Sequence, residues 1–356
     1  MSDGAARALA SGSAGEIAAL FAPLARAGGV LLAVSGGPDS TALMILAARW
    51  AAQGARPPIA AATVDHGLRE GARAEAGMAA ALAARLGLPH HLLEWTGPRP
   101  RSRIQERARQ ARYGLLGACA RAIGADFLVT AHHADDQAET VLFRLLRGSG
   151  IGGLRGMAPA AALDGLTLAR PLLGASKREL VAICEAAGAA YADDPSNADP
   201  RFARTRMRRL TALLAAEGLG AGEIARLARR AGQMEEAVVA QTRAAAARLG
   251  WNEPRATRDA RALMAEPIEI AQRLLAGEIA RVAGRPARQL RLEAIENLAR
   301  ALAEAQAHGR ALRANVGGAS VDLSAGGALG VSPEAPRRSG ATPPAQAAGR
   351  AAPPGA

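Results

Sequence analysis

The chain contains two short stretches whose side chains could do chemistry, and the first reads Ser35-Gly36-Gly37-Pro38-Asp39-Ser40. Gly36 and Gly37 have no Cβ, so a phosphate group could approach the backbone closely, and the N–H groups of a following helix would favour an anion there. A Walker loop ends in Gly-Lys-Ser or Gly-Lys-Thr, and this stretch does not. We therefore expect a different phosphate-binding loop, in which Asp39 holds a cation such as Mg²⁺ or caps the helix.

The second stretch, TAHHADDQAET at residues 130–140, is dense in histidines and carboxylates. On a helix, Asp136 and Glu139 are three residues apart and share one face. Two carboxylates on one face could hold a substrate ammonium group or Mg²⁺. The histidines and acids together could instead form a metal cluster, and Asp135 by itself could be a helix N-cap.

Alternating strand and helix patterns would position these side chains. Apolar, partly β-branched runs predict strands, and Ala- and Leu-rich stretches between them predict helices. The expected strands are 30–34, 59–64, 90–95 and 127–130. This order predicts an α/β fold with a parallel, doubly wound sheet of the kind that binds ligands beyond the carboxyl ends of its strands. The phosphate loop, the stretch at 130–140, and Asp65 with His66 after the second strand should meet at that edge.

The length of 356 residues predicts more than one domain. A long helical pattern follows the α/β part, then alternating residues with paired glycines, then a segment dominated by Pro, Ala, Gly and Arg. We expect an N-terminal helix with a frayed end at 1–27, a catalytic α/β domain at 28–218, a smaller, mainly helical domain at 219–310, a small β-hairpin unit at 311–331 and a disordered tail at 332–356.

The composition restricts the partners of the protein. A formal charge of +12 favours a polyanion such as nucleic acid. However, Lys177 is the only lysine, and a coding bias toward arginine would produce the same charge. Cys119 and Cys184 form no CxxC pair, which disfavours a thiol-redox or zinc-ribbon function. No signal-peptide pattern or apolar run of membrane length occurs, so we expect a cytoplasmic protein with no membrane partner.

Several motifs resemble those of known enzymes. The loop SGGPDS resembles the pyrophosphate (PP) loop of the N-type ATP pyrophosphatases, which cleave ATP to AMP and pyrophosphate. Residues 30–210 are similar, in the same order, to the signature segments of the tRNA(Ile)-lysidine synthetase family. These segments read DHGLR at 65–69, QERARQARY at 105–113, TAHHADDQAET at 130–140, RLLRGSGIGGL at 144–154, RPLL at 170–173 and DDPSNADPRFAR at 193–204. The helical region that follows fits the family more loosely.

The resemblance implies a two-step reaction. ATP would bind at residues 35–40 with Mg²⁺, and Asp65 and His66 would line the nucleotide site. The wobble cytidine of tRNA(Ile) with the CAU anticodon would be adenylated at its 2-oxygen. The amine of L-lysine would then displace AMP and form lysidine.

The same resemblance implies roles for three further side chains. Arg112, in the motif ARxxRY, would orient the substrates together with Asp136 and Glu139, and the two acids would hold the lysine ammonium. This is chemically sensible, because carboxylates bind amines and arginine neutralises phosphate or carboxylate charge. Since the attacking amine must lose a proton, His133 is a candidate base.

A stretch rich in arginine after residue 200 predicts a basic helix that binds tRNA phosphates. Its candidate residues are Arg201, Arg204, Arg206 and Arg208. No acid occurs from residue 201 to residue 214, which favours RNA over a merely solvated charged face. Thr205 stands where the family usually has Asn in the motif Arg-Asn-x-Ile-Arg, so a contact made by that amide is in doubt.

Other functions stay open from the sequence. The nearest alternative function is that of another PP-loop enzyme that modifies tRNA, although a thiolating enzyme of this kind would need more cysteines. A metal-dependent phosphoesterase could be built on Asp65, His66 and residues 132–136, but it would not need the phosphate loop. A nucleotide-binding protein without catalysis would not need Asp136 and Glu139. The sequence leaves the oligomeric state open, and a homodimer is one option.

Overall fold

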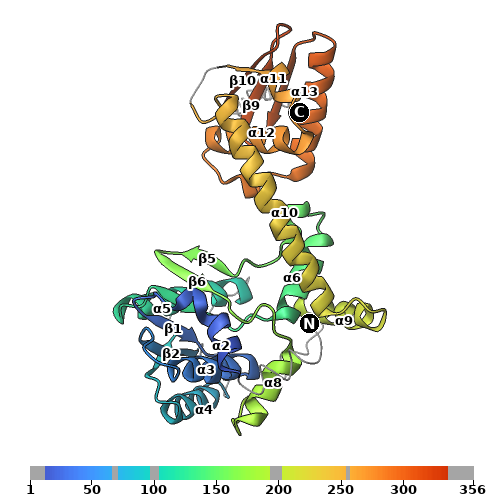
Figure 1. Ribbon diagram of the computed structural model, residues 1–356. Helices are drawn as coiled ribbons and strands as arrows, with labels where there is room; N and C mark the ends of the chain where they lie inside the picture. Colours follow the sequence, from blue (N-terminus) through green and yellow to red (C-terminus); the bar gives the residue numbers. More distant parts are fainter. Residues whose placement is uncertain (1–12, 66–70, 97–103, 193–202, 254–256, 336–356) are drawn as a thin grey trace, which may run out of the picture. The chain divides into compact units, whose positions relative to one another are not determined.

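The computed structural model describes residues 13–65, 71–96, 104–192, 203–253 and 257–335 of the chain. The chain divides into two compact units, Met1–Glu236 and Ala237–Ala356 (Figure 1). The division falls within a long helix, α10 (Ala221–Arg248), whereas we predicted that the catalytic domain ends at residue 218. Most of the predicted tail at 332–356 lies outside the described residues, as does most of the predicted frayed end.

A six-stranded sheet forms the centre of the N-terminal unit. Its strands are β1 (Val30–Ala33), β2 (Ile59–Asp65), β3 (His90–Glu94), β4 (Phe127–Val129), β5 (Ala160–Leu163) and β6 (Leu166–Ala169). In the order β3-β2-β1-β4-β6-β5, all neighbouring strands are parallel except β5 and β6, which confirms the predicted parallel sheet. β5 and β6 form a hairpin whose turn residues, Asp164 and Gly165, have φ angles of 44° and 83°, as a type I′ turn requires.

Helices cover both faces of this sheet (Figure 1). One face carries α2 (Ala14–Phe21), the short 3₁₀ turn η1 (Ala22–Leu24), α3 (Pro38–Ala51), α4 (Ala72–Arg85) and α8 (Lys177–Ala186), and the other face carries α5 (Ile104–Ala122). A smaller group consists of α6 (Ala134–Leu145), α7 (Ile151–Leu154), α9 (Ala203–Ala216) and the first turns of α10. Within the described segments, no helix has both the length and the apolar character needed to cross a membrane.

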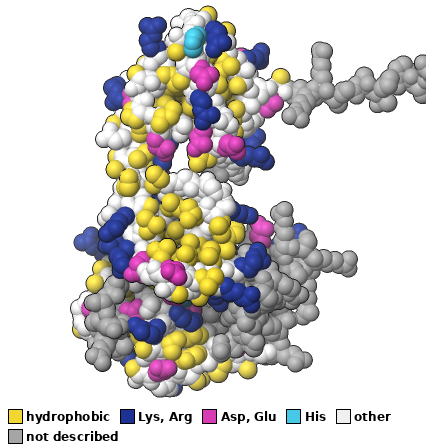
Figure 2. Space-filling view, turned by 90° about the vertical axis from the view of Figure 1, so that its right-hand side faces the viewer, with side chains coloured by type: hydrophobic (Ala, Val, Ile, Leu, Met, Phe, Trp, Pro, Cys, Tyr) yellow, Lys and Arg dark blue, Asp and Glu magenta, His cyan; other side chains and the backbone are white. Residues whose placement is uncertain are grey.

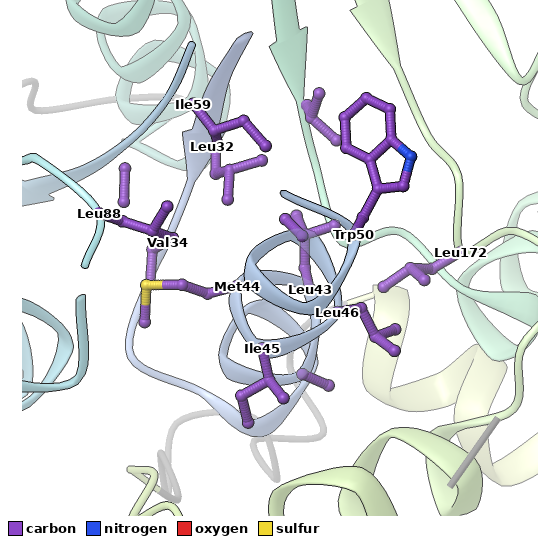
Figure 3. Close-up of a cluster of buried hydrophobic side chains, with 14 of the residues drawn as sticks. Leu32, Val34, Leu43, Met44, Ile45, Leu46, Trp50, Ile59, Leu88 and Leu172 are labelled. Carbon is purple, nitrogen blue, oxygen red and sulfur yellow. The ribbon is translucent and has the colours of Figure 1, made fainter. Parts of the chain in front are cut away.

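The core of the N-terminal unit fixes the position of α3. Successive residues of β1 point to opposite faces of the sheet, so Leu32 packs toward Leu43 and Trp50 of α3, while Leu31 packs toward Leu116 of α5. Figure 3 shows the α3 side of this core, with strand and helix side chains in one apolar layer. Because α3 follows β1 directly, its first turn lies at the carboxyl edge of the sheet, where we expected the ligand to bind.

The C-terminal unit packs helices on a four-stranded antiparallel sheet of order β7-β10-β9-β8. Its elements are β7 (Arg258–Asp259), α11 (Ala260–Met264), α12 (Ile268–Val282), η3 (Ala287–Gln289), α13 (Leu292–Ala307), β8 (Leu312–Val316), β9 (Ala319–Leu323) and β10 (Ala328–Pro333). Leu275 of α12, Leu302 of α13 and Val321 of β9 share one core. The strands over 311–331 are therefore not the separate hairpin unit that we predicted, because a small hairpin cannot bury its own apolar face.

Candidate active site

The predicted phosphate loop connects β1 to α3 and has a fixed backbone. The Ser40 Oγ accepts a hydrogen bond from the Ser35 N–H at 3.1 Å and donates one to the Gly37 carbonyl at 3.0 Å. Gly36 has a φ angle of 84°, and a Cβ at this position would lie 3.1 Å from the carbonyl oxygen of Glu75 in α4. Only glycine therefore fits at position 36 without strain.

The N-terminus of α3 is open toward the loop. Gly37 is the N-cap residue, Pro38 is the first helical residue, and no side chain in the described part of the chain caps this helix. Its first N–H groups and its dipole therefore favour an anion. A phosphate group bound at the loop would supply that anion.

The loop opens into a cavity of about 980 Å³. The predicted site residues that line it are Ser35, Gly37, Pro38, Asp39, Ser40, Arg112, His133, Asp136, Glu139 and Arg208. The phosphate loop and the acidic stretch meet in this cavity, as expected from the carboxyl edge of the sheet, and Arg112 of the ARxxRY motif and Arg208 of α9 also line it. Asp65 ends β2 but is not among the lining residues, and His66 lies outside the described residues.

His133 lies at the start of α6, close to three carboxylates. Its Nε2 is 3.6 Å from both Asp39 Oδ2 and Asp136 Oδ2, and its Nδ1 is 3.4 Å from Asp135 Oδ2. Burial alone would lower the pKa of this imidazole, but Asp135, Asp39 and Asp136 together raise the pKa to about 10. His133 is also the N-cap of α6, because its Nδ1 accepts a hydrogen bond from the Asp135 N–H at 3.3 Å, so the N-cap is His133 rather than Asp135. The role of a base that we predicted for His133 stays a prediction.

Asp39, in the first turn of α3, has two cationic neighbours. Lys177, the first residue of α8, donates from Nζ to Asp39 Oδ1 at 2.7 Å, while Oδ2 faces His133. Burial alone would raise the pKa of the Asp39 carboxyl group, but His133 and then Lys177 outweigh it and hold the pKa below its usual value. Lys177 was not predicted at this site, because 138 residues separate it from Asp39. Lys177 is the only lysine of the chain, and this feature of the sequence could have drawn attention to it.

The two acids predicted to hold lysine lie in the same cavity but have different partners. Glu139 is buried and accepts a hydrogen bond from Arg208 Nε at 2.7 Å. Asp136 turns instead toward His133, whose backbone N–H donates to Asp136 Oδ2 at 3.2 Å. Arg208 belongs to α9 and its side chain is 48% exposed, so one residue of the basic helix reaches from solvent to Glu139.

The remaining arginines of α9 face outward where they are described. Arg206 and Arg209 are exposed on α9, whereas the side chain of Arg204 and the whole of Arg201 lie outside the described residues. Figure 2 shows arginine side chains spread over the visible face rather than gathered in one patch. The net charge alone therefore does not locate a surface for RNA.

Comparison with known proteins identifies the family. Residues 9–214 match the PP-loop domain family. The curated tRNA(Ile)-lysidine synthase of Methylobacterium nodulans is 54% identical over 318 residues, which are 88% of this chain and 93% of the relative. A curated tRNA(Ile)-lysidine synthase of Bradyrhizobium sp. (strain BTAi1) is 48% identical over 346 residues, or 92% of this chain and 96% of the relative. The chain belongs to the tRNA(Ile)-lysidine synthase family.

The tRNA(Ile)-lysidine synthase family was also the one indicated by the sequence motifs, so that prediction is confirmed. Among solved structures, a similar fold occurs in the U34-tRNA thiolase NcsA from Methanococcus maripaludis, with a TM-score of 0.54 over 63% of this chain and 80% of that chain. The two sequences are only 17% identical, so this likeness concerns the fold alone.

The acidic side chains of this lysidine synthase family member fit a magnesium ion that arrives with ATP. Mg²⁺ is usually held by one or two carboxylates together with substrate phosphates. Asp39 and Asp136 each place a carboxylate oxygen 3.6 Å from the same atom, Nε2 of His133, beside the phosphate loop. Among the residues that the structure describes, no three His, Cys, Asp or Glu side chains are arranged to hold a metal by themselves. The described part of the chain therefore gives no support to the metal cluster of a phosphoesterase.

Proposed function

We propose that this chain ligates L-lysine to C2 of the wobble cytidine of tRNA(Ile) with the CAU anticodon, using ATP and releasing AMP and pyrophosphate. The observation that carries the proposal is one cavity that joins the phosphate loop to Arg112 and to the acidic residues Asp136 and Glu139. The curated relatives are named for lysidine formation in tRNA(Ile) and match this chain over most of its length, which supports the same assignment.

In the first step, the 2-oxygen of cytosine attacks the α-phosphorus of ATP. The bond from this phosphorus to the bridging oxygen breaks, and its electron pair leaves with pyrophosphate. The open N-terminus of α3 and the hydroxyl groups of Ser35 and Ser40 bind the phosphates. Mg²⁺ held by the phosphates and Asp39 would neutralise charge on the leaving group.

In the second step, the ε-amine of lysine attacks C2 of the adenylated cytosine. The bond from C2 to its 2-oxygen breaks, AMP leaves with that oxygen, and the proton of the amine passes to water. Glu139 and Asp136 hold the ammonium groups of lysine, which would be costly to bury without acidic partners. Arg112 neutralises the phosphate or carboxylate charge in the cavity. Because Arg208 already donates to Glu139, lysine must displace or share this arginine.

The tRNA itself would contact the basic helix. The proposed phosphate-binding residues are Arg201, Arg204, Arg206 and Arg208. Such contacts position an RNA without reading its bases, so the choice of the cytidine would rest on the cavity. We also propose that the enzyme works in the cytoplasm, where tRNA and ATP are available.

The direct test is an incubation of the purified chain with ATP, Mg²⁺, labelled lysine and a tRNA(Ile) transcript that carries the CAU anticodon. We expect label in this tRNA and equimolar AMP and pyrophosphate. The matched control is the same transcript with uridine at the wobble position, which should stay unlabelled. ATP-dependent modification of tRNA without lysine would indicate another PP-loop enzyme, and ATP-independent cleavage of phosphate esters would indicate a phosphoesterase. Either result would reject the proposal.

A further inference from the structure

We propose that Lys177 binds the β- and γ-phosphates of ATP and then the pyrophosphate that leaves. This assignment rests on the proposed function, because it concerns the same ATP cavity. The loop at residues 35–40 offers N–H and hydroxyl donors but contains no cationic side chain. In Walker loops a lysine of the loop itself reaches these phosphates. Here the cation that lies at the loop comes from α8 instead.

The backbone of Lys177 is fixed on the wall of the cavity. Its own N–H donates to Asp135 Oδ2 at 3.0 Å. Ser176 caps α8, since its Oγ accepts a hydrogen bond from the Glu179 N–H at 3.3 Å. Leu180 is fully buried in the core that α8 shares with α3. Any movement of the ammonium group must therefore come from the side chain, which has four rotatable bonds.

The ammonium group lies beside the position where the phosphates would bind. Nζ of Lys177 is 2.7 Å from Oδ1 of Asp39, which belongs to the first turn of α3. Both side chains line the cavity, and 43% of the Lys177 side chain is exposed. A small rotation would take Nζ from Asp39 to a phosphate oxygen.

ATP binding with Mg²⁺ supplies the reason for that rotation. Asp39 fits the role of a magnesium ligand, and a carboxylate that binds Mg²⁺ no longer needs Lys177 as its counterion. An ammonium group left unpaired in the cavity would be costly, whereas phosphate oxygens would satisfy it. Negative charge grows on the bridging oxygen as the bond to the α-phosphorus breaks, so a nearby cation stabilises this transition state.

The cation at this position is a lysine, although the chain otherwise uses arginine. Lys177 is the single lysine among 44 basic residues, in a chain that otherwise uses arginine. An ammonium group is a compact point charge that can fit between a carboxylate and a phosphate, whereas a guanidinium group is planar and broader. We therefore expect Lys177→Arg to restore only part of the binding lost in a neutral variant.

The first test uses the full chain and chemical labelling. Because Lys177 is the only lysine, an amine-acetylating reagent followed by peptide mass spectrometry reports on this one side chain. We expect pyrophosphate with Mg²⁺ to slow the acetylation of Lys177 by about tenfold or more, and AMP to have little effect. Equal rates with and without pyrophosphate would overturn the assignment.

The second test measures binding of pyrophosphate and of AMP by calorimetry. Lys177→Met should weaken pyrophosphate binding by about 10- to 100-fold and leave AMP binding nearly unchanged. The matched control is Arg178→Met, which removes a charge from the next residue of α8, whose exposed side chain does not line the cavity. Lys177→Gln is a second neutral variant in case the methionine variant does not fold.

The proposed function and the assignment of Lys177 would be contradicted by different results. If the wild-type chain forms lysidine but Lys177→Met and Lys177→Gln keep their pyrophosphate affinity, this inference is wrong and the proposed function stands. The same holds if both variants lose AMP binding as strongly as pyrophosphate binding, because Lys177 would then only support the loop. If the wild-type chain binds pyrophosphate and Lys177 is protected but no lysidine forms, the proposed function fails while the assignment of Lys177 stands.

Discussion

Replacing Gly36 by alanine tests whether the phosphate loop needs its left-handed backbone. Gly36 has a φ angle of 84°, where a residue with a Cβ is strained, and the added Cβ would lie 3.1 Å from the carbonyl oxygen of Glu75. Strain of this kind costs about 1–3 kcal/mol. Gly37 is the matched control, since its φ is −75° and its Cβ would meet no atom closer than 3.9 Å. Gly37→Ala should stay within about 0.5 kcal/mol of the wild type.

Hydrogen exchange of the buried amides of β1 and α3 is the suitable assay, because it reports the free energy of opening in the N-terminal unit alone. In Gly36→Ala the equilibrium constant for opening should rise by about 5- to 150-fold, which corresponds to the range given above. The affinity for MgATP should fall as well, because the loop is distorted. Equal exchange in Gly36→Ala and Gly37→Ala would refute the reasoning, since only position 36 combines a positive φ angle with a close contact to Glu75.

Three further predictions concern other parts of the chain. Glu139→Gln should raise the lysine concentration at half-maximal rate by about tenfold or more while MgATP affinity is kept; a loss of MgATP binding instead would reassign Glu139 to the metal. Replacing Arg206 and Arg209 together by glutamine should weaken tRNA binding and lower the salt slope by about 1–2, and an unchanged slope would make α9 a solvated face. In the C-terminal unit, burial alone would raise the pKa of Glu278, but Arg281 and Arg258 hold it below 4.5. The stability that comes from this lowered pKa is present above pH 4.5 and is lost as the pH falls through the folded-state pKa. Glu278→Gln should therefore make the hydrogen exchange of α12 and α13 less sensitive to acid. An unchanged sensitivity would contradict this prediction.

Local chemistry was enough to predict the architecture of the catalytic unit. The apolar run of β1 is buried on both faces of the sheet, and such runs predict parallel strands. The Gly36-Gly37 turn between a strand and a helix predicts a phosphate loop, because both features are set by residues adjacent in the chain. Strand ends also predict which motifs meet, since parallel strands place their carboxyl ends at one edge. For this reason the meeting of the phosphate loop with Asp136 and Glu139 could be expected from the sequence, whereas Arg112 was assigned to the site only by the family resemblance.

Other properties depend on contacts between distant parts of the chain, so only the tertiary structure decides them. Lys177 meets Asp39 across 138 residues, and Arg208 meets Glu139 across 69 residues. Three carboxylates lie 3.4–3.6 Å from the ring nitrogens of His133 and raise its pKa to about 10. No local pattern encodes these pairings, because a side chain's charge state depends on which charges the fold places around it and on how far they are shielded from water.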